Sequence, residues 1–530
     1  MNKFMVTRGI RGMNQNQLIE NMRKLIDELL ENISHLKSEN NKLKTENSYL
    51  KNKIEKTKAG IEEYAKKQIE KELAKIIKEL NDEKALNATL TSKLNIDSTN
   101  SGTPTSQTPY GKQKRVPNTR QKTDKKKGGQ EGHPANKLKK FETKELTMVI
   151  GHSPEVEKCD VCGSDLEFVK STDKDEYVIV FRVEKVRHTF YEYKCPKCGK
   201  KFKVNIPLNL KEENQYNSSV QALAAILLNE GYVSINRTKS IISGLTNGEI
   251  NMSEGFISKI NTRLASAVRQ FYLDLQLAVI RLKLMFWDDT VIRINGKNAI
   301  IRFYGNERLA LYYAHEKKDT ESVDDDGIKL LRGEDQFSMH DHNTINYNPK
   351  YKEQDAECGI HLIRRLKRIL DDTKHEWCND LIKLLVSANN QKKEGKPINL
   401  DKLRADYDDI IKQGQEINKA DKDNYFWKNE RSLLNDLTKY KENYLMFAAY
   451  DFIPFTNNLS ERSLRAEKIK LSVSGQFSNL ERAQDHAVIR SYLETGKRHG
   501  YNLYELIVRV LEGNYVTLEE MEEHASLIGG

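Results

Sequence analysis

The stretch "LKLMFWDDTVIRINGKNAIIRFYGNERLALYYAH", residues 282–315, decides the fold of this 530-residue chain. Apolar and polar residues alternate here in runs of strand length, and the turn sequences Asn295-Gly296 and "GNER" separate the runs. Asn-Gly between two such runs is typical of a type I′ hairpin, because both positions need a positive φ. We therefore predict an antiparallel meander of three strands, over 284–294, 298–304 and 309–315.

The residues after the meander predict a change to parallel pairing. A helix over 319–332 leads to a fourth strand over 336–341, and a helical crossover places that strand parallel to an earlier one. Three strands, a helix and a strand form the front half of a ribonuclease H-like domain. Asp288 lies on the first strand and Asp341 ends the fourth. Neighbouring strands can bring these carboxylates together, and Mg²⁺ shared with phosphate oxygens would relieve their repulsion.

Composition and charge limit the remaining possibilities. Lys and Arg number 87 against 77 Asp and Glu, which gives a formal net charge of +10. The length allows roughly three or four domains, yet the mean hydropathy of -0.72 indicates much solvated helix or linker. No apolar window is long enough for a membrane helix, and the N-terminal residues have no apolar signal-peptide core. We therefore expect a cytoplasmic protein.

A heptad repeat runs through residues 13–96, which we interpret as a coiled-coil oligomerisation region. The a positions are Ile26, Ile33, Asn40, Asn47 and Ile54, and the d positions are Met22, Leu29, Leu36, Leu43 and Leu50. Leucine at d and two asparagines at a favour a parallel homodimer over higher homo-oligomers. A helix that packs on its own chain is the alternative.

Residues 97–150 are rich in Ser, Thr, Pro, Gly and Lys, and we predict a flexible basic linker. Within it, residues 112–127 carry eight basic side chains against one Asp. Such a density suits contacts with DNA phosphates, although a merely solvated linker is as good an explanation for any single lysine. The candidate DNA-binding residues are Lys112, Lys114, Arg115, Lys125, Lys126 and Lys127.

Four of the six cysteines form two knuckles, "CDVCG" and "CPKCG". Cys159, Cys162, Cys195 and Cys198 together complete a tetrahedral site, so we predict a structural Zn²⁺ ion in a zinc ribbon over 151–210. The alternating residues between the knuckles predict two strands. Redox or disulfide use is the alternative.

Residues 211–280 contain successive short helical periods that break at "LTNGEI", and Ser253 is the predicted N-cap of the next helix. The pattern resembles a helix-turn-helix and favours a helical DNA-binding region. An ordinary helical bundle fits almost equally well.

Several ordered motifs together carry a family resemblance: "GGQEGH" (128–133), the paired knuckles, "WDDT" (287–290), "HDHNTINYN" (340–348), "CGIHLIRRL" (358–366), "TNNLSER" (456–462) and "YLETGKRHGYNLYELI" (492–507). In these the chain resembles the transposases of the insertion-sequence-66 family. The resemblance implies a D-D-E transposase whose triad is Asp288, Asp341 and Glu461.

The resemblance also implies the arrangement of the C-terminal half. The fold class is multidomain α+β, with a ribonuclease H-like α/β catalytic core whose first part spans 281–350. A helical insertion follows over 351–450, the second part with the Glu461 helix spans 451–515, and 516–530 form a tail. Cys358 and His361 form a C-x-x-H pair, which we interpret as a packed cysteine beside a polar histidine.

The chemistry implied is metal-dependent cleavage of DNA and strand transfer. Two Mg²⁺ (or Mn²⁺) ions per active site, bound by the triad, would activate water and then the freed 3′-hydroxyl. The expected partners are element-end and target DNA, a second copy of the chain, and any accessory proteins of the same element, but no membrane; the expected location is the cytoplasm, in association with the nucleoid. The alternatives are a catalytically inactive DNA-binding regulator and a hydrolytic nuclease.

Glu461 is the single acid in the basic stretch "PFTNNLSERSLR", residues 454–465. If a helix begins at Asn457 or Asn458, spacings of three and four residues place Glu461 on one face with Arg465 and Lys468. The acid would bind metal, while Arg462, Arg465 and Lys468 bind DNA phosphates. A surface ion pair between Glu461 and Arg465 is the alternative.

Overall fold

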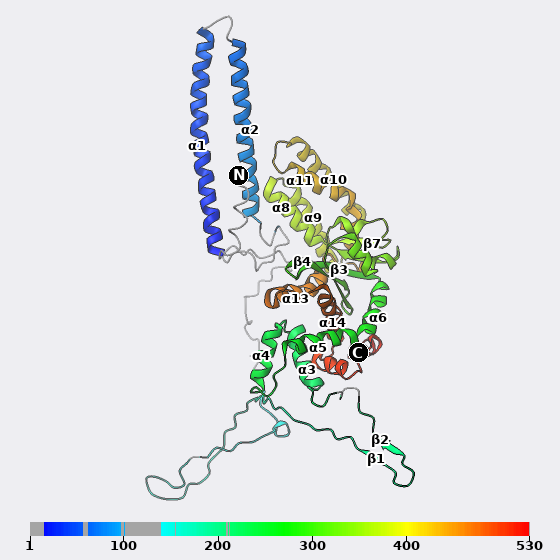
Figure 1. Cartoon of the computed structure of the whole chain (residues 1–530). Helices are drawn as coiled ribbons and strands as arrows, with labels where there is room; N and C mark the ends of the chain where they lie inside the picture. The colour runs from blue at the N-terminus through cyan, green and yellow to red at the C-terminus, as the bar shows by residue number, and fades with distance from the viewer. Residues whose placement is uncertain are drawn as a thin grey trace. The chain divides into compact units, whose positions relative to one another are not determined.

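In this computed structural model, the residues described are 15–56, 62–96, 100, 139–153, 155–207, 210 and 212–528. The chain divides into two units, Met1–Ile96 and Asp97–Gly530 (Figure 1). None of the described helices is both long and apolar enough to span a membrane.

The first unit contains two long helices, α1 (Gln15–Lys56) and α2 (Glu62–Leu94). Between residues 26 and 40 of α1, the half-buried side chains are those of Ile26, Leu29, Ile33, Leu36 and Asn40. These are the a and d positions of the predicted heptads, and the side chains between them are exposed. The helical part of the prediction is confirmed, and the oligomeric state stays a prediction.

The second unit is built around a five-stranded mixed sheet in the order β5-β4-β3-β6-β7. Its strands are β3 (Leu284–Ile294), β4 (Lys297–Gly305), β5 (Ala310–His315), β6 (Phe337–His340) and β7 (Gln354–Glu357). The predicted meander is confirmed, since β3, β4 and β5 pair antiparallel. Asn295 and Gly296 have φ values of 45° and 78°, as a type I′ turn requires.

The connection to the fourth strand differs in detail from the prediction. Helix α7 (Thr320–Asp326) is short because Gly327 adopts a φ of 71° and ends it, and the 3-10 helix η4 (Lys329–Leu331) completes the crossover. β6 then pairs parallel with β3, as predicted. The start of the helical insertion was predicted wrongly, because β7 belongs to the sheet and pairs parallel with β6.

Helices cover both faces of the sheet (Figure 1). The insertion follows β7 and consists of α8 (Gly359–Thr373), α9 (Trp377–Lys393), α10 (Leu400–Ala420), α11 (Trp427–Lys439) and α12 (Lys441–Ala449). Phe286, Ile292 and Ile294 of β3 belong to the hydrophobic cluster shared with these helices. Met285 and Trp287, which point to the opposite face, belong to a second cluster.

The second cluster joins the helices before the sheet to those at the end of the chain. The former are α3 (Ser218–Asn229), α4 (Ile235–Leu245), α5 (Glu254–Ala267) and α6 (Arg269–Ile280). The latter are α14 (Leu480–Arg498), α15 (Leu503–Leu511) and α16 (Leu518–Ile528). The segment 516–530, which was predicted to be a tail, therefore contains a helix. Ser253 caps α5 by accepting from the Phe256 amide, as predicted.

Helix α14 also protects the outer edge of the sheet. The hydroxyl oxygens of Ser491 and Thr495 accept the backbone N–H groups of Tyr312 and Ala310 on β5, at 2.8 and 3.1 Å. An unpaired strand edge invites association with other chains. These two side chains therefore satisfy donors that a neighbouring strand would otherwise use.

The region between the cysteine knuckles has little regular structure. Of residues 155–207, only β1 (Glu192–Lys194) and β2 (Lys201–Lys203) form paired strands. The prediction of two strands between the knuckles is therefore wrong except for Glu192–Lys194. Tyr177, Val178, Ile179 and Val180 are all at least 70% exposed, and the ring contact of Tyr177 is with Phe141, outside the knuckle region, so little apolar burial is present to hold a strand pair together.

A buried hydrogen bond joins α14 to α13 (Asn458–Ser474), the helix that carries Glu461. His486 Nε2 lies 2.9 Å from Glu467 Oε2, and both side chains are almost fully buried. Burial lowers the pKa of His486, although Glu467 acts in the opposite direction. The folded protein therefore holds His486 neutral where an unfolded histidine would take up a proton.

Stability should consequently fall in acid through His486. Below the unfolded histidine pKa of about 6.5, proton uptake by the unfolded chain lowers the free energy of unfolding by up to about 1.4 kcal/mol per pH unit. Urea denaturation at pH 7.0 and 5.5 should show a smaller loss in His486→Gln than in the wild type. The exposed His152→Gln is the control and should follow the wild type; an equal or larger loss in His486→Gln would contradict this account.

Candidate functional site

The pairing of β3 with β6 brings Asp288 and Asp341 to the same place. Phe286 is paired with Met339 in the parallel register, and two residues further along each chain are Asp288 and Asp341. Burial raises the pKa of Asp288 well above its usual range, and the charges of Asp341 and then Asp289 raise it further. The predicted neighbourhood of these two acids is therefore present in the structure.

Glu461 reaches the same place from a distant part of the sequence. It lies in the first turn of α13, which begins at Asn458 as predicted and packs on β3 and β4. Within the described residues, its ion pairs are with α8, at 3.7 Å to His361 and 3.8 Å to Arg364. The alternative of a surface pair with Arg465 is not what the structure shows.

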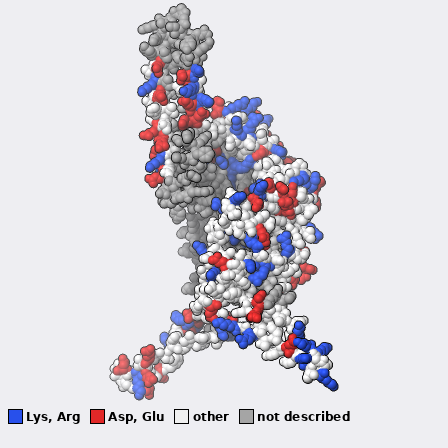
Figure 2. All heavy atoms as spheres, viewed as in Figure 1, with Lys and Arg blue, Asp and Glu red and all other residues white. Residues whose placement is uncertain are grey.

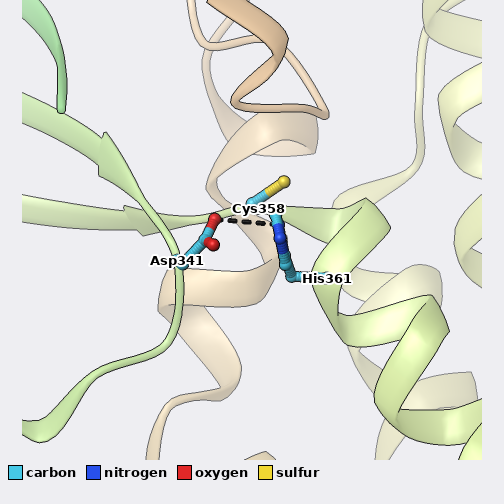
Figure 3. A group of neighbouring side chains, drawn as sticks. All are labelled: Asp341, Cys358 and His361. Atoms are coloured by element: carbon cyan, nitrogen blue, oxygen red, sulfur yellow. Dashed lines mark ion pairs between the residues drawn. The ribbon is translucent and has the colours of Figure 1, made fainter. Parts of the chain in front are cut away.

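His361 of α8 lies between two of the acids. Its Nδ1 is 2.8 Å from Asp341 Oδ1 (Figure 3). Its Nε2 lies 3.7 Å from Glu461 Oε1. Burial alone would lower the pKa of His361, but its contacts with Asp341 and Cys358 raise it to about 11. Arg364, and His361 in its protonated form, thus supply positive charge beside Asp341 and Glu461.

Asn457, the N-cap residue of α13, connects the elements that carry the acids. Its side-chain Nδ2 donates to the carbonyl of Trp287, the residue before Asp288, at 3.0 Å. Its backbone N–H donates to Cys358 Sγ at 3.2 Å. The side chain of Asn457 is fully buried. One residue therefore joins β3, the start of α8 and the start of α13.

The three acids are of the chemical type that binds a divalent cation such as Mg²⁺ or Mn²⁺, which prefer carboxylate oxygens, although their ligand atoms do not all lie within 4.8 Å of one another. Burial, and then the charge of Asp341, raises the pKa of Asp288, so a cation beside the two would favour its charged form. Asp288, Asp341 and Glu461 would hold the ion. The Asp289 side chain is bound instead by Lys318, at 2.6 Å.

The basic residues predicted to bind DNA divide into two groups. Arg462, Arg465 and Lys468 are exposed along α13. The predicted linker residues Lys112, Lys114, Arg115, Lys125, Lys126 and Lys127 lie outside the described residues.

The two cysteine knuckles adopt the same turn. Cys159 N–H donates to Ser164 O at 2.9 Å, and Cys195 N–H donates to Lys200 O at 2.8 Å. Gly163 and Gly199, which follow the second cysteine of each pair, have φ values of 73° and 75°. No three of the thiols lie within 4.8 Å of one another in the described residues. A zinc ion shared by both knuckles therefore stays a prediction.

Sequence reasoning missed the parts played by His361, Arg364 and Asn457. The C-x-x-H spacing of Cys358 and His361 was a signal for the first of these, but it was interpreted as packing. No local pattern reveals Asn457, because its partners, Trp287 and Cys358, are 170 and 99 residues away in the sequence.

Comparison with known protein families identifies a matching region of the chain that includes this site. The model of the Transposase IS66 family matches residues 213–485. The matched region contains Asp288, Asp341 and Glu461. Among curated proteins, none matches the sequence.

Replacing Asn457 should destabilise the second unit. Asn457→Ala leaves the buried Trp287 carbonyl without its donor, which costs about 1–3 kcal/mol. Chemical denaturation followed by tryptophan fluorescence measures the change, since Trp287 lies at the contact. Asn458→Ala is the matched control, because this neighbour is exposed, and a similar loss in both variants would contradict the anchoring role.

Proposed function

Because the chain belongs to the IS66 family of transposases, we propose that it binds the ends of its mobile element and carries out metal-dependent DNA cleavage and strand transfer. The observation that carries the proposal is the convergence of Asp288, Asp341 and Glu461, from β3, the end of β6 and α13, around His361.

The sheet supports a ribonuclease H-like catalytic core. Three antiparallel strands are followed by two strands parallel to the first, in the order β5-β4-β3-β6-β7. The insertion stands between β7 and α13, so the acid on α13 follows it in the chain. One acid lies on the central strand β3, one follows the neighbouring strand β6, and one is on α13, which packs on β3 and β4.

The residues of the chain have separate tasks in the proposed reaction. Asp288, Asp341 and Glu461 would hold divalent metal ions, which, when bound, activate the attacking water or 3′-hydroxyl and stabilise charge on the phosphate. Arg462, Arg465 and Lys468 present positive charge to the DNA backbone from the exposed side of the same helix. Asn457 keeps Glu461 at a fixed distance from Asp288.

The proposed DNA contacts come from particular helices and not from one large basic surface patch. On the face drawn in Figure 2, basic and acidic side chains are interspersed over most of the described surface. The helices α3–α6 are further candidates, since α4 and the Ser253-capped α5 lie where the sequence predicts a helix-turn-helix. A catalytically inactive regulator would not need all three acids, and all three are present.

The other predicted parts would assemble and support the enzyme. The half-buried a and d face of α1 fits a homodimeric coiled coil, because two such faces bury each other and the Asn40 side chains can pair. The matching knuckles fit a structural Zn²⁺ ion, which would supply folding free energy to a segment whose apolar side chains are exposed.

The triad is tested by charge removal. Glu461→Gln and Asp288→Asn keep the side-chain shape but remove a ligand, so cleavage of element-end DNA in Mg²⁺ should fall at least about 1,000-fold, and the double variant should be hardly worse than either single one. Binding to the same DNA should persist, since repulsion of phosphate is reduced.

Asp289→Asn is the matched control for the triad. This neighbour points to the opposite face of β3 and is bound by Lys318, so most cleavage should remain. Glu461→Gln that cuts at nearly the wild-type rate would remove the third acid from the proposal, and an inactive Asp289 variant beside an active Asp288 variant would reverse their assignment.

The knuckles are tested by metal analysis. Cys159→Ser should lower the zinc content of the purified protein by one equivalent per chain and expose residues 155–207 to protease. The core should stay folded, because the fully buried residues of both hydrophobic clusters begin at Ala222. Asp160→Ser, within the same knuckle, should keep its zinc; equal zinc contents in wild type and Cys159→Ser would refute the site.

A further inference from the structure

Cys358 and His361 meet at the start of α8, next to the proposed catalytic site. Cys358 is the residue before the helix, directly after β7, and His361 lies within the first turn. Positions i and i+3 share one face of a helix start.

A third donor completes a possible metal site. Asp341, Cys358 and His361 each offer a ligand atom, and the three atoms lie within 4.8 Å of one another (Figure 3). Cys358 is 1% exposed. Asp341 Oδ1 and His361 Nδ1 approach to 2.8 Å, yet both are buried atoms without a hydrogen-bond partner of normal geometry. These two atoms face each other, and neither has another hydrogen-bond partner among the described residues.

The surroundings of these donors resemble the outer shell of a metal site. A backbone N–H, from Asn457, donates to Cys358 Sγ at 3.2 Å and would stabilise a thiolate. His361 Nε2 faces the Glu461 carboxylate at 3.7 Å. A ligating histidine commonly donates its second N–H to a carboxylate, which fixes the tautomer and orients the ring.

When His361 binds the metal ion through Nδ1, the remaining proton of its ring is on Nε2. Arg364 Nη1, which now lies 3.2 Å from Nε2, would then direct its N–H groups to Glu461, which it already approaches at 3.8 Å. Glu461 Oε1 would accept from both, and its second oxygen would stay available for the proposed Mg²⁺ site.

The donor types decide the class of metal. Mg²⁺ prefers oxygen ligands and does not select a thiolate, whereas Zn²⁺ and Co²⁺ bind Cys, His and Asp together. We propose that Cys358, His361 and Asp341 bind one transition-metal ion of the Zn²⁺ class, distinct from both the knuckle zinc and the Mg²⁺ ions. The inference rests on the proposed function in one respect: Asp341 would be shared, so the ion would hold that carboxylate in position beside Asp288.

Cobalt titration of the full chain tests the site apart from the knuckles. Cys159, Cys162, Cys195 and Cys198 are replaced by serine, metal is removed, and Co²⁺ is added. One equivalent should bind per chain and give the near-ultraviolet absorption of a thiolate–cobalt bond. Adding Cys358→Ser should abolish that band, whereas adding Cys378→Ser, a buried cysteine of α9, should leave it unchanged.

Further variants keep the test decisive if Cys358→Ser does not fold. His361→Gln retains the thiolate but loses a ligand, so Co²⁺ affinity should fall at least about tenfold. A missing thiolate band in the knuckle-free chain, or a band unaffected by both Cys358→Ser and His361→Gln, overturns the site.

The transition-metal site and the transposase mechanism can each be disproved without disproving the other. A chain that cleaves DNA in Mg²⁺ but shows no cobalt–thiolate band disproves the transition-metal site alone. A chain that shows the band but no Mg²⁺-dependent cleavage disproves the transposase mechanism alone. Asp288→Asn should remove cleavage and keep the band, because Asp288 belongs only to the Mg²⁺ set.

Discussion

The hydrogen bond from the Asn457 side chain to the Trp287 carbonyl is the contact on which the site depends. It ties the N-terminus of α13 to β3 one residue before Asp288, while the Asn457 backbone ties the same point to Cys358. Gly359 N–H donates to Phe455 O at 2.9 Å beside it, and a Cβ at Gly359 would lie 2.3 Å from the Phe455 ring. The approach of α8 to this segment is thus close enough to require glycine.

The charges of the site constrain the helices around it. Three carboxylates would repel one another strongly if the surroundings held no positive charge, and α8 provides His361 and Arg364 within 4 Å of two of them. This explains the isolated acid in the basic stretch of α13: Glu461 faces α8, whereas Arg462, Arg465 and Lys468 face solvent. One helix therefore presents opposite charges to the site and to the proposed DNA.

The sequence was informative where local pattern controls structure. Alternation and Asn295-Gly296 predicted β3 and β4 closely, and the crossover predicted parallel pairing for β6. β7 was not predicted, because its sequence "QDAE" has neither alternation nor β-branched residues. It forms a strand because it pairs with β6. Asp288, Asp341 and Glu461 could be named from motifs, and the C-x-x-H spacing singled out His361, but the role of Asn457 depends on tertiary contacts that no spacing encodes. The prediction of two strands between the cysteine knuckles was wrong for another reason, because the apolar residues there have no hydrophobic core of their own to pack against.

The insertion supports the site through α8 and through α12, which packs on β7. Buried polar contacts within the insertion join α9 to α11: Trp377 Nε1 donates to Glu430 Oε1 at 2.6 Å, and His375 Nδ1 lies 2.8 Å from the same oxygen. Arg365 of α8 pairs with Asp436 of α11. His361 and Arg364 project from the beginning of α8 to Asp341 and Glu461. The helix that leaves the sheet after β7 therefore both opens the insertion and carries two basic side chains to these carboxylates.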